Sequence, residues 1–394
     1  MKKAIIFGAG NIGRGFLGQL LFLSEYKVIF IDVDINLINS LNKEKKYCIE
    51  IVGENPEKIE ITNIEAIFAQ EKEKIIKEIV SSDIIVSAVG VGAIKYIIPT
   101  IASGLLERFK KQVITPLNII ICENLYNAKE FYKKSILEEL KTKSISLLEI
   151  TSYLEQNLGL VESVIGRMVP IMTKEEKEQN PLLIKVEKYC ELPVNKEGFK
   201  GKIPQIIHLI PADNFQSYVD RKLYTHNCGH AICAYLGNYK GYTYIADAIC
   251  DKWIYEKVLL VMKNETGKAL IKKHNLDEKV HFEHVEDLIK RFGNKFLGDT
   301  IFRVARDPIR KLSFSDRLIG AANLCLSFNI IPDNLCFGIV LAFNYFNEDD
   351  ICSQELKTLR EKEGIEGIME KICKIDLNSD LAKIIREKNQ KYIK

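Results

Sequence analysis

The stretch AIIFGAGNIGRG, residues 4–15, decides the fold of this chain. Its first four residues, Ala4 to Phe7, are apolar and read as a short buried strand. Three glycines follow at GxGxxG spacing, namely Gly8, Gly10 and Gly13. An amphipathic pattern from Ile12 to Leu23 then predicts a helix. A strand, a glycine-rich turn and a helix in this order are typical of the first unit of a doubly wound α/β sheet.

The first third of the chain continues this alternation of strands and helices. We expect strands at Val28 to Ile31, Asp83 to Val89 and Asn118 to Cys122, with short helices such as Ile35 to Leu41 between them. Later helical patterns include 246–262, 285–292, 315–326 and 381–393. The sequence therefore predicts an α/β chain, with a Rossmann-type doubly wound sheet in residues 1–190 and a mostly α-helical domain in residues 191–394.

Composition excludes several classes of protein. A chain of 394 residues exceeds what a single core usually supports, which favours two domains. The net charge is only +3 and no basic block occurs, so we expect no nucleic-acid partner. The first apolar run ends at Gly8, too early for a signal peptide, and no run approaches the roughly 18 apolar residues of a membrane span. We expect a cytoplasmic protein.

The ten cysteines are scattered, without CxxC pairs or a cysteine–histidine ligand spacing. Free thiols in a reducing compartment are the favoured interpretation, and we expect no metal site.

The glycine turn predicts a dinucleotide site. Glycines let the backbone approach a pyrophosphate, and the helix N-terminus offers free N–H groups. The expected binding residues of this turn are Gly8, Gly10, Asn11, Ile12 and Gly13. Asp32 ends the second strand about 20 residues later, where an acid accepts from the ribose hydroxyls of NAD and repels a 2′-phosphate. One alternative is that the glycines serve packing alone and Asp32 caps a helix. Another is FAD, which shares this fingerprint. Arg14 is interpreted either as a phosphate ligand or as a solvated arginine.

Two further strand ends are candidates, because ligands of such sheets lie outside the carboxyl ends of the strands. The SAVGVG segment predicts that the backbone of Ala88, Val89 and Gly90 runs beside the nicotinamide ribose. The NIIICEN segment ends in Glu123 and Asn124, and for Glu123 a capping or surface role is the favoured interpretation.

A second candidate site is the segment RKLYTHNCGH, residues 221–230, which predicts a buried helix carrying polar groups. At about 100° per residue from Lys222, His230 falls at about 80° and Asn227 at about 140°, so all three share one side. A buried lysine has a lowered pKa and can act as a general base. Asn227, with Asn124 of the other domain, can donate to an oxygen that gains negative charge.

His230 is expected to orient Lys222 or to hold a substrate hydroxyl, and Gly229 is expected to leave room for a ligand. His226 lies on the same side without an assigned role. The alternative for each polar residue taken singly is a satisfied core group.

With these motifs in view, the chain resembles the polyol-specific long-chain dehydrogenases of the mannitol dehydrogenase family. The resemblance rests on GAGNIGRGF at 8–16, AVG at 88–90, NIIICEN at 118–124, the spacing of Lys222, Asn227 and His230, and the RKL and DRL elements at 310–312 and 316–318. It covers nearly the whole chain. It implies a zinc-independent, NAD-dependent interconversion of mannitol 1-phosphate and fructose 6-phosphate, with the lysine as base, the asparagines as oxyanion hole, and a monomeric enzyme.

The chain departs from the phosphate-specific members at two positions. It has Cys228 in NCGHA where they usually have threonine, and Gly166 in IGRMVP where they have an acid beside the residue that matches Arg167. Substrate choice therefore stays open among a hexitol phosphate, a free polyol and a hexonate. A hypothesis of a different class is a non-catalytic NAD(H)-binding sensor. Arg221 and Lys311 are the candidate ligands of a sugar phosphate, or ordinary ion-pair residues.

Overall fold

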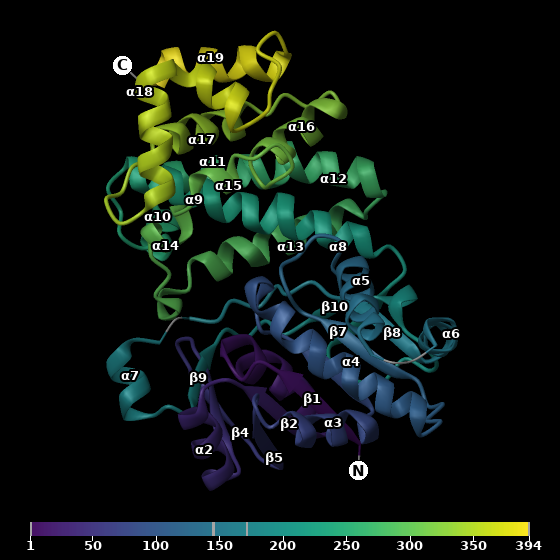
Figure 1. Ribbon diagram of the computed structural model, residues 1–394. Helices are drawn as coiled ribbons and strands as arrows, with labels where there is room; N and C mark the ends of the chain where they lie inside the picture. The colour runs from purple at the N-terminus through teal and green to yellow at the C-terminus, as the bar shows by residue number, and fades with distance from the viewer. Residues whose placement is uncertain (1, 144–145, 171, 393–394) are drawn as a thin grey trace. The chain divides into compact units, whose positions relative to one another are not determined.

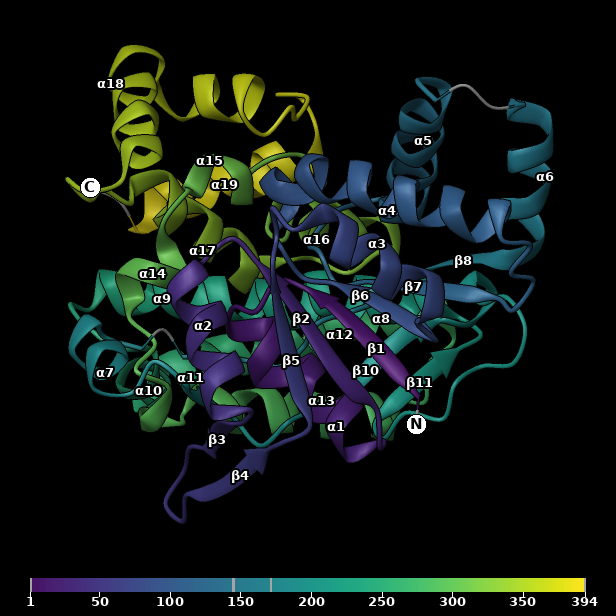
Figure 2. The ribbon, with the colours of Figure 1, turned by 60° about the horizontal axis from the view of Figure 1, so that its bottom comes forward.

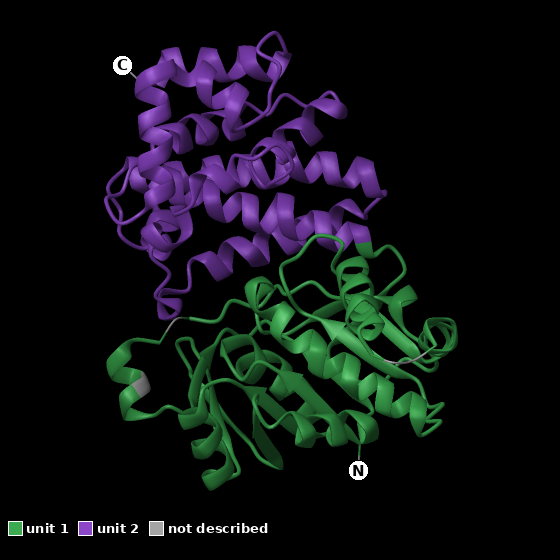
Figure 3. Ribbon diagram, viewed as in Figure 1, with its two compact units in different colours: residues 1–215 green, residues 216–394 purple. Residues whose placement is uncertain are grey.

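The computed structural model describes residues 2–143, 146–170 and 172–392 and divides the chain into two compact units, Met1–Phe215 and Gln216–Lys394 (Figure 3). The boundary predicted at residue 190 lies earlier than this division. Two short parallel strands, β10 (Leu192–Asn195) and β11 (Leu209–Ala212), lie between residue 190 and the observed division. A bridge between Ser163 and Val194 joins β10 to the rest of the first unit.

The first unit is built on a six-stranded sheet in the order β5-β2-β1-β6-β7-β8. All neighbouring strands run parallel. The strands are β1 (Lys3–Phe7), β2 (Lys27–Asp32), β5 (Ile64–Phe68), β6 (Ile84–Ser87), β7 (Leu117–Ile121) and β8 (Leu158–Glu162). The strand order reverses direction between β1 and β6, which is the topological switch point of a doubly wound sheet. The predicted fold class is confirmed.

Helices cover both faces of this sheet, which is why its strands are apolar on both sides. In β1, Ile5 and Phe7 pack under α3 (Lys72–Ser81), α4 (Ile94–Lys110) and α5 (Ala128–Lys141). Ala4 and Ile6 face the opposite layer, which contains α1 (Gln19–Leu23) and α2 (Ile35–Glu44). Figure 2 shows α3 and α4 on one side of the strands and α1 on the other.

Smaller elements complete the first unit. A three-stranded sheet has the order β4-β3-β9. The remaining elements are β3 (Tyr47–Ile51), β4 (Glu57–Ile61), β9 (Leu183–Val186), α6 (Leu147–Asn157), α7 (Lys174–Gln179) and the turns of 3₁₀ helix η2 (Val91–Ala93) and η3 (Lys196–Gly198).

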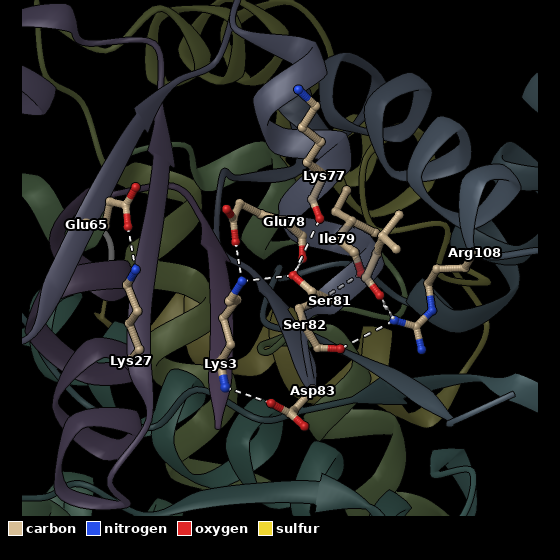
Figure 4. A network of polar contacts seen from close by, with 11 residues as sticks. Lys3, Lys27, Glu65, Lys77, Glu78, Ile79, Ser81, Ser82, Asp83 and Arg108 are labelled. Atoms are coloured by element: carbon tan, nitrogen blue, oxygen red, sulfur yellow. Dashed lines mark hydrogen bonds and ion pairs between the residues drawn. The ribbon is translucent and has the colours of Figure 1, made fainter. Parts of the chain in front are cut away.

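The amino-terminal edge of the sheet is held by a polar network (Figure 4). The backbone N–H of Lys3 donates to Asp83 and its ammonium group pairs with Glu78 at 2.6 Å. Arg108, only 2% exposed, donates to the carbonyls of Ile79, Val80, Ser82 and Thr115. These carbonyls lie at the end of α3 and after α4, so one side chain satisfies acceptors that the helices leave unpaired.

Arg108→Met is expected to lower the free energy of unfolding by about 3 kcal/mol, because it leaves several buried carbonyls without a donor. The measurement is a urea unfolding midpoint. The control is Lys110→Met on the same helix, since Lys110 is exposed and forms an ion pair with Glu107, and such pairs contribute at most about 1 kcal/mol. Equal midpoints for the two variants would contradict this role of Arg108.

The second unit consists of helices joined by loops, with one isolated bridge between Tyr244 and Thr300 among its described residues (Figure 1). Its α-helices are α8 (Phe215–Arg221), α9 (Cys228–Tyr239), α10 (Ile245–Cys250), α11 (Lys252–Leu259), α12 (Thr266–His274), α13 (Glu278–Phe292), α14 (Ile301–Ala305), α15 (Pro308–Lys311), α16 (Ile319–Ser327), α17 (Asp333–Asn344), α18 (Ile351–Lys371) and α19 (Asp380–Tyr392).

Several boundaries differ from the sequence prediction. The helix expected at 246–262 is interrupted at Asp251, whose carboxylate accepts from Trp253 N–H and Ile254 N–H and so starts α11. The helix expected at 315–326 begins only at Ile319. The last predicted helix corresponds to α19, and residue 393 lies outside the described residues. None of the helices among the described residues is long and apolar enough to cross a membrane.

Candidate active site

The glycine turn lies between β1 and a helical segment that includes a π-helix, η1 (Gly13–Gly18). Gly8 has φ +98°, and a Cβ there would approach the carbonyl oxygen of Ala88 to 2.5 Å. A Cβ on Gly13 would lie 1.8 Å from the carbonyl oxygen of Gly8. A Cβ on Gly10 would meet nothing within 4 Å. Packing therefore explains Gly8 and Gly13, whereas at Gly10 the absence of a side chain leaves the backbone open to a ligand.

Asp32 lies at the end of β2, beside this turn. One carboxylate oxygen accepts from Ala9 N–H at 2.6 Å, and the other accepts from Asp34 N–H at 3.0 Å. The carboxylate thus holds the turn and still has acceptor capacity for a ribose hydroxyl. The residues of the turn fit the phosphates and ribose of a dinucleotide.

Arg14 is neither a solvated arginine nor placed as a phosphate ligand, the two interpretations considered from the sequence. It is 6% exposed, and its side chain donates to the carbonyls of Ala9 and Pro181. Burial lowers the pKa of its guanidinium group. Arg14 is therefore a structural residue under the turn, while Asn11 and Ile12 remain partly accessible at the start of the helix.

Glu123 is buried at the carboxyl ends of β6 and β7, which corrects the surface or capping role favoured from sequence. Its carboxylate accepts from Ser87 Oγ at 2.8 Å, Tyr132 OH at 3.2 Å and Val89 N–H at 3.2 Å. Burial raises its pKa, against the effect of these hydrogen bonds. It fixes the path of the AVG segment, in which Ala88 and Val89 are half-buried and Gly90 is exposed with φ +83°. The next residue, Asn124, is exposed.

The second polar group lies on a π-helix, η4 (Lys222–Asn227), between α8 and α9. The N–H of Cys228 donates to the carbonyl of Leu223, five residues earlier. This wider turn brings residues five apart onto adjacent turns, so the angle of about 140° expected between Lys222 and Asn227 does not apply. Both residues are half-buried, and so is His230 in α9.

Lys222 and His230 have partners that fix them. Lys222 Nζ lies 3.3 Å from His226 Nδ1. His230 stacks on Phe292 with ring centroids 4.8 Å apart, and its Nε2 lies 2.9 Å from Asp299 Oδ2. Burial alone would raise the pKa of Asp299, but His230 and Arg303 hold it below its ordinary value.

Sequence reasoning missed Asp299 and Phe292. They come from a loop and from α13, far along the chain from His230, and no local pattern marks them.

Gly229 has a packing role, not the predicted role of leaving room for a ligand. A Cβ there would lie 2.3 Å from Met262 Sδ. Met262 belongs to a further π-helix, η5 (Leu260–Glu265), which packs against α9 at this point.

The two candidate phosphate ligands have different environments. Arg221 is half-buried at the end of α8, with its guanidinium group 4.8 Å from the ring centroid of Tyr218. Lys311 is 3% exposed and donates to the carbonyl of Arg306. Burial, together with Arg310 and Arg317, lowers its pKa to about 7. The burial of Lys311 argues against phosphate binding by its side chain, whereas the partly exposed Arg221 remains a candidate.

Arg167, which lacks an acidic neighbour at Gly166, has other partners. It donates to the carbonyls of Glu187 and Gly15 and to Gln19 Oε1 at 2.7 Å. All ten cysteines are free. Among the described residues, no three His, Cys, Asp or Glu side chains are placed to hold a metal ion.

Comparison with known proteins assigns the chain to a family. The family model for the mannitol dehydrogenase Rossmann domain matches residues 2–208, and that for the mannitol dehydrogenase C-terminal domain matches residues 214–392. The chain belongs to the mannitol dehydrogenase family. It is therefore an oxidoreductase with an NAD-type Rossmann fold, and the resemblance seen in the sequence is confirmed.

Two relatives match at least 98% of the chain. A mannitol-1-phosphate 5-dehydrogenase of Buchnera aphidicola subsp. Acyrthosiphon pisum (strain APS) is 38% identical over 390 residues, 98% of each chain. The enzyme of the same name from Buchnera aphidicola subsp. Schizaphis graminum (strain Sg) is 37% identical, covering 100% of this chain and 99% of the relative.

Two solved structures have the same fold as this chain. Pseudomonas fluorescens mannitol 2-dehydrogenase, in a ternary complex with NAD and D-mannitol, has a TM-score of 0.76 at 13% identity, covering 99% of this chain and 91% of that one. A substrate-free D-sorbitol dehydrogenase has a TM-score of 0.80 at 15% identity, with coverages of 98% and 93%.

Proposed function

We propose that this chain interconverts mannitol 1-phosphate and fructose 6-phosphate with NAD, without a metal ion. The observation that supports it most is end-to-end identity of 37–38% to proteins named mannitol-1-phosphate 5-dehydrogenase. Lys222, Asn227 and His230, which carry the proposed chemistry, lie within one short segment of the second unit.

In the oxidative direction, Lys222 in its neutral form accepts the proton of the substrate hydroxyl. Asn227 and Asn124 donate amide N–H groups to the oxygen as it gains negative charge. His230, held by Asp299 and Phe292, contacts a neighbouring hydroxyl. Bound NAD supplies the acceptor for the hydride that leaves the carbon. In the reductive direction, Lys222 returns the proton.

The proposed cofactor residues are the glycine turn from Gly8 to Gly13, Asp32 and the segment from Ala88 to Gly90. The open space at Gly10 and the free acceptor capacity of Asp32 support NAD there. For the phosphate we propose Arg221, because a guanidinium group matches a phosphate with paired N–H donors.

Asp32→Asn is expected to raise the preference for NADP over NAD by at least about tenfold, since it removes a charge that repels the 2′-phosphate. The amide oxygen can still accept from Ala9 N–H in the glycine turn, whereas the hydrogen bond from Asp34 N–H is lost. The measurement is kcat/KM with each cofactor. Asp34→Asn is the control, because Asp34 caps α2. An unchanged ratio in Asp32→Asn would argue against the role of Asp32.

The test of the proposed function is NADH oxidation with fructose 6-phosphate, fructose and fructuronate at equal concentrations. We expect turnover with the phosphate and little with the other two. Turnover with an unphosphorylated sugar would move the assignment to a free-polyol or hexonate dehydrogenase. NADH binding without turnover on any substrate would favour a sensor. The cytoplasmic location and the monomeric state stay predictions, and sedimentation checks the second.

A further inference from the structure

His226, left without a role by the sequence, touches the proposed base. Its side chain is 5% exposed, and its Nδ1 lies 3.3 Å from Lys222 Nζ. Its ring meets Phe292 edge-on at 5.8 Å between centroids and His230 at 6.2 Å. The imidazole is therefore enclosed by rings and has little freedom to turn.

The charge of His226 follows from this environment. Burial lowers its pKa well below the ordinary value, and the nearby Lys222 and Arg291 lower it further. The ring is neutral at physiological pH, and a neutral imidazole has one acceptor nitrogen. A lysine ammonium group can only donate, so we take Nδ1, which faces it, as the acceptor nitrogen of the neutral ring.

The other charged groups around His226 come from the helices packed on η4. On α13 and α9 these are Arg291, His284 and His230. The basic residues Lys273 and His274 of α12 are both paired with Asp220 of α8, at 2.6 Å and 2.8 Å. Asp299 is engaged by His230 and Arg303.

We propose that His226 is the positioning residue of Lys222, which its neutral Nδ1 directs toward the substrate hydroxyl. This inference rests on the proposed function, in which Lys222 is the base. A carboxylate in the same place would favour the ammonium form by about one to three pKa units and leave the lysine protonated before reaction. A neutral acceptor orients the Lys222 amine without raising its pKa in this way.

Four variants test this proposal. His226→Asn keeps an acceptor near the place of Nδ1, and kcat is expected to stay within about threefold of wild type. His226→Leu has no acceptor, and His226→Gln carries its amide one methylene further from the backbone, away from the place of Nδ1. In both variants kcat is expected to fall by roughly 10- to 100-fold, the cost of a misplaced catalytic group. In the reductive direction, where Lys222 must be protonated, His226→Asp is expected to shift the basic limb of the kcat–pH profile upward by at least about one unit.

A second readout does not depend on turnover. The pH dependence of acylation at Lys222, followed by mass spectrometry of the proteolytic peptide that carries this residue, gives the pKa of its amine. We expect the pKa to be lowest in His226→Leu, near wild type in His226→Asn and highest in His226→Asp.

The outcomes separate the two proposals. If wild type turns over no sugar, the proposed function fails, and the order of acylation pKa values still decides the role of His226. Equal kcat and equal Lys222 pKa across the variants would overturn the positioning role. If the leucine and aspartate variants do not fold, the asparagine and glutamine variants decide, and equal kcat for these two would overturn it.

Discussion

Lys222→Ala is expected to reduce kcat by roughly 10³-fold with fructose 6-phosphate, while NADH binding stays unchanged, because general acid–base catalysis typically contributes 10²- to 10⁴-fold. Lys222 is half-buried and held by His226, so its truncation removes the proton donor and acceptor without opening a large cavity. The measurement is single-turnover NADH oxidation beside an NADH titration.

Lys222→Arg tests whether Lys222 acts by transferring a proton or only by its positive charge. Arginine keeps the positive charge but stays protonated at any accessible pH, so this variant is also expected to be nearly inactive. Lys257→Ala is the matched control, because Lys257 is a half-buried lysine of the same unit that donates to Asn334 Oδ1 at 2.8 Å. Activity in Lys222→Arg near that of wild type would show that Lys222 supplies charge and not proton transfer.

Gly13→Ala is expected to abolish NADH binding and to destabilise the first unit. The added Cβ would lie 1.8 Å from the carbonyl oxygen of Gly8, and this backbone cannot move without breaking the turn. Overpacking of this kind costs about 1–3 kcal/mol or more. The measurements are the thermal unfolding midpoint and an NADH fluorescence titration.

Gly10→Ala is expected to weaken NADH binding without destabilising the first unit. A Cβ there meets no protein atom within 4 Å, so the variant is expected to fold as wild type while NADH binding weakens by at least about tenfold, or 1.4 kcal/mol. Gly53→Ala, also in open space, is the control for both properties. If Gly10→Ala binds NADH as wild type does, the pyrophosphate does not approach this backbone.

The sequence predicts what local periodicity and turn chemistry determine. The strand before Gly8, the acid at the end of β2 and the helical second unit follow from patterns within about 15 residues. The contacts that surround the site join residues far apart in the sequence, so local patterns do not predict them. Arg14 is a cation like those that bind phosphates, yet it is buried and donates to the carbonyl of Pro181, 167 residues along the chain.

In the candidate site, too, local sequence predicts some features and tertiary contacts determine the others. Lys222, Asn227 and His230 are visible as a spaced motif, but the π-helix that changes their relative angle has no signature in hydrophobic periodicity. Glu123 looks like a surface acid until Ser87 and Tyr132 are placed beside it. The contacts of Asp299 with His230 likewise depend on tertiary structure.

The central claim is hydride transfer between NAD and the carbonyl carbon of a sugar phosphate. Its most direct test uses NADH fully deuterated at nicotinamide C4, fructose 6-phosphate and mass spectrometry of the product. We expect mannitol phosphate carrying deuterium on the carbon that was the carbonyl of fructose 6-phosphate. An unlabelled product, or reduction of fructose while fructose 6-phosphate is left untouched, would contradict the account.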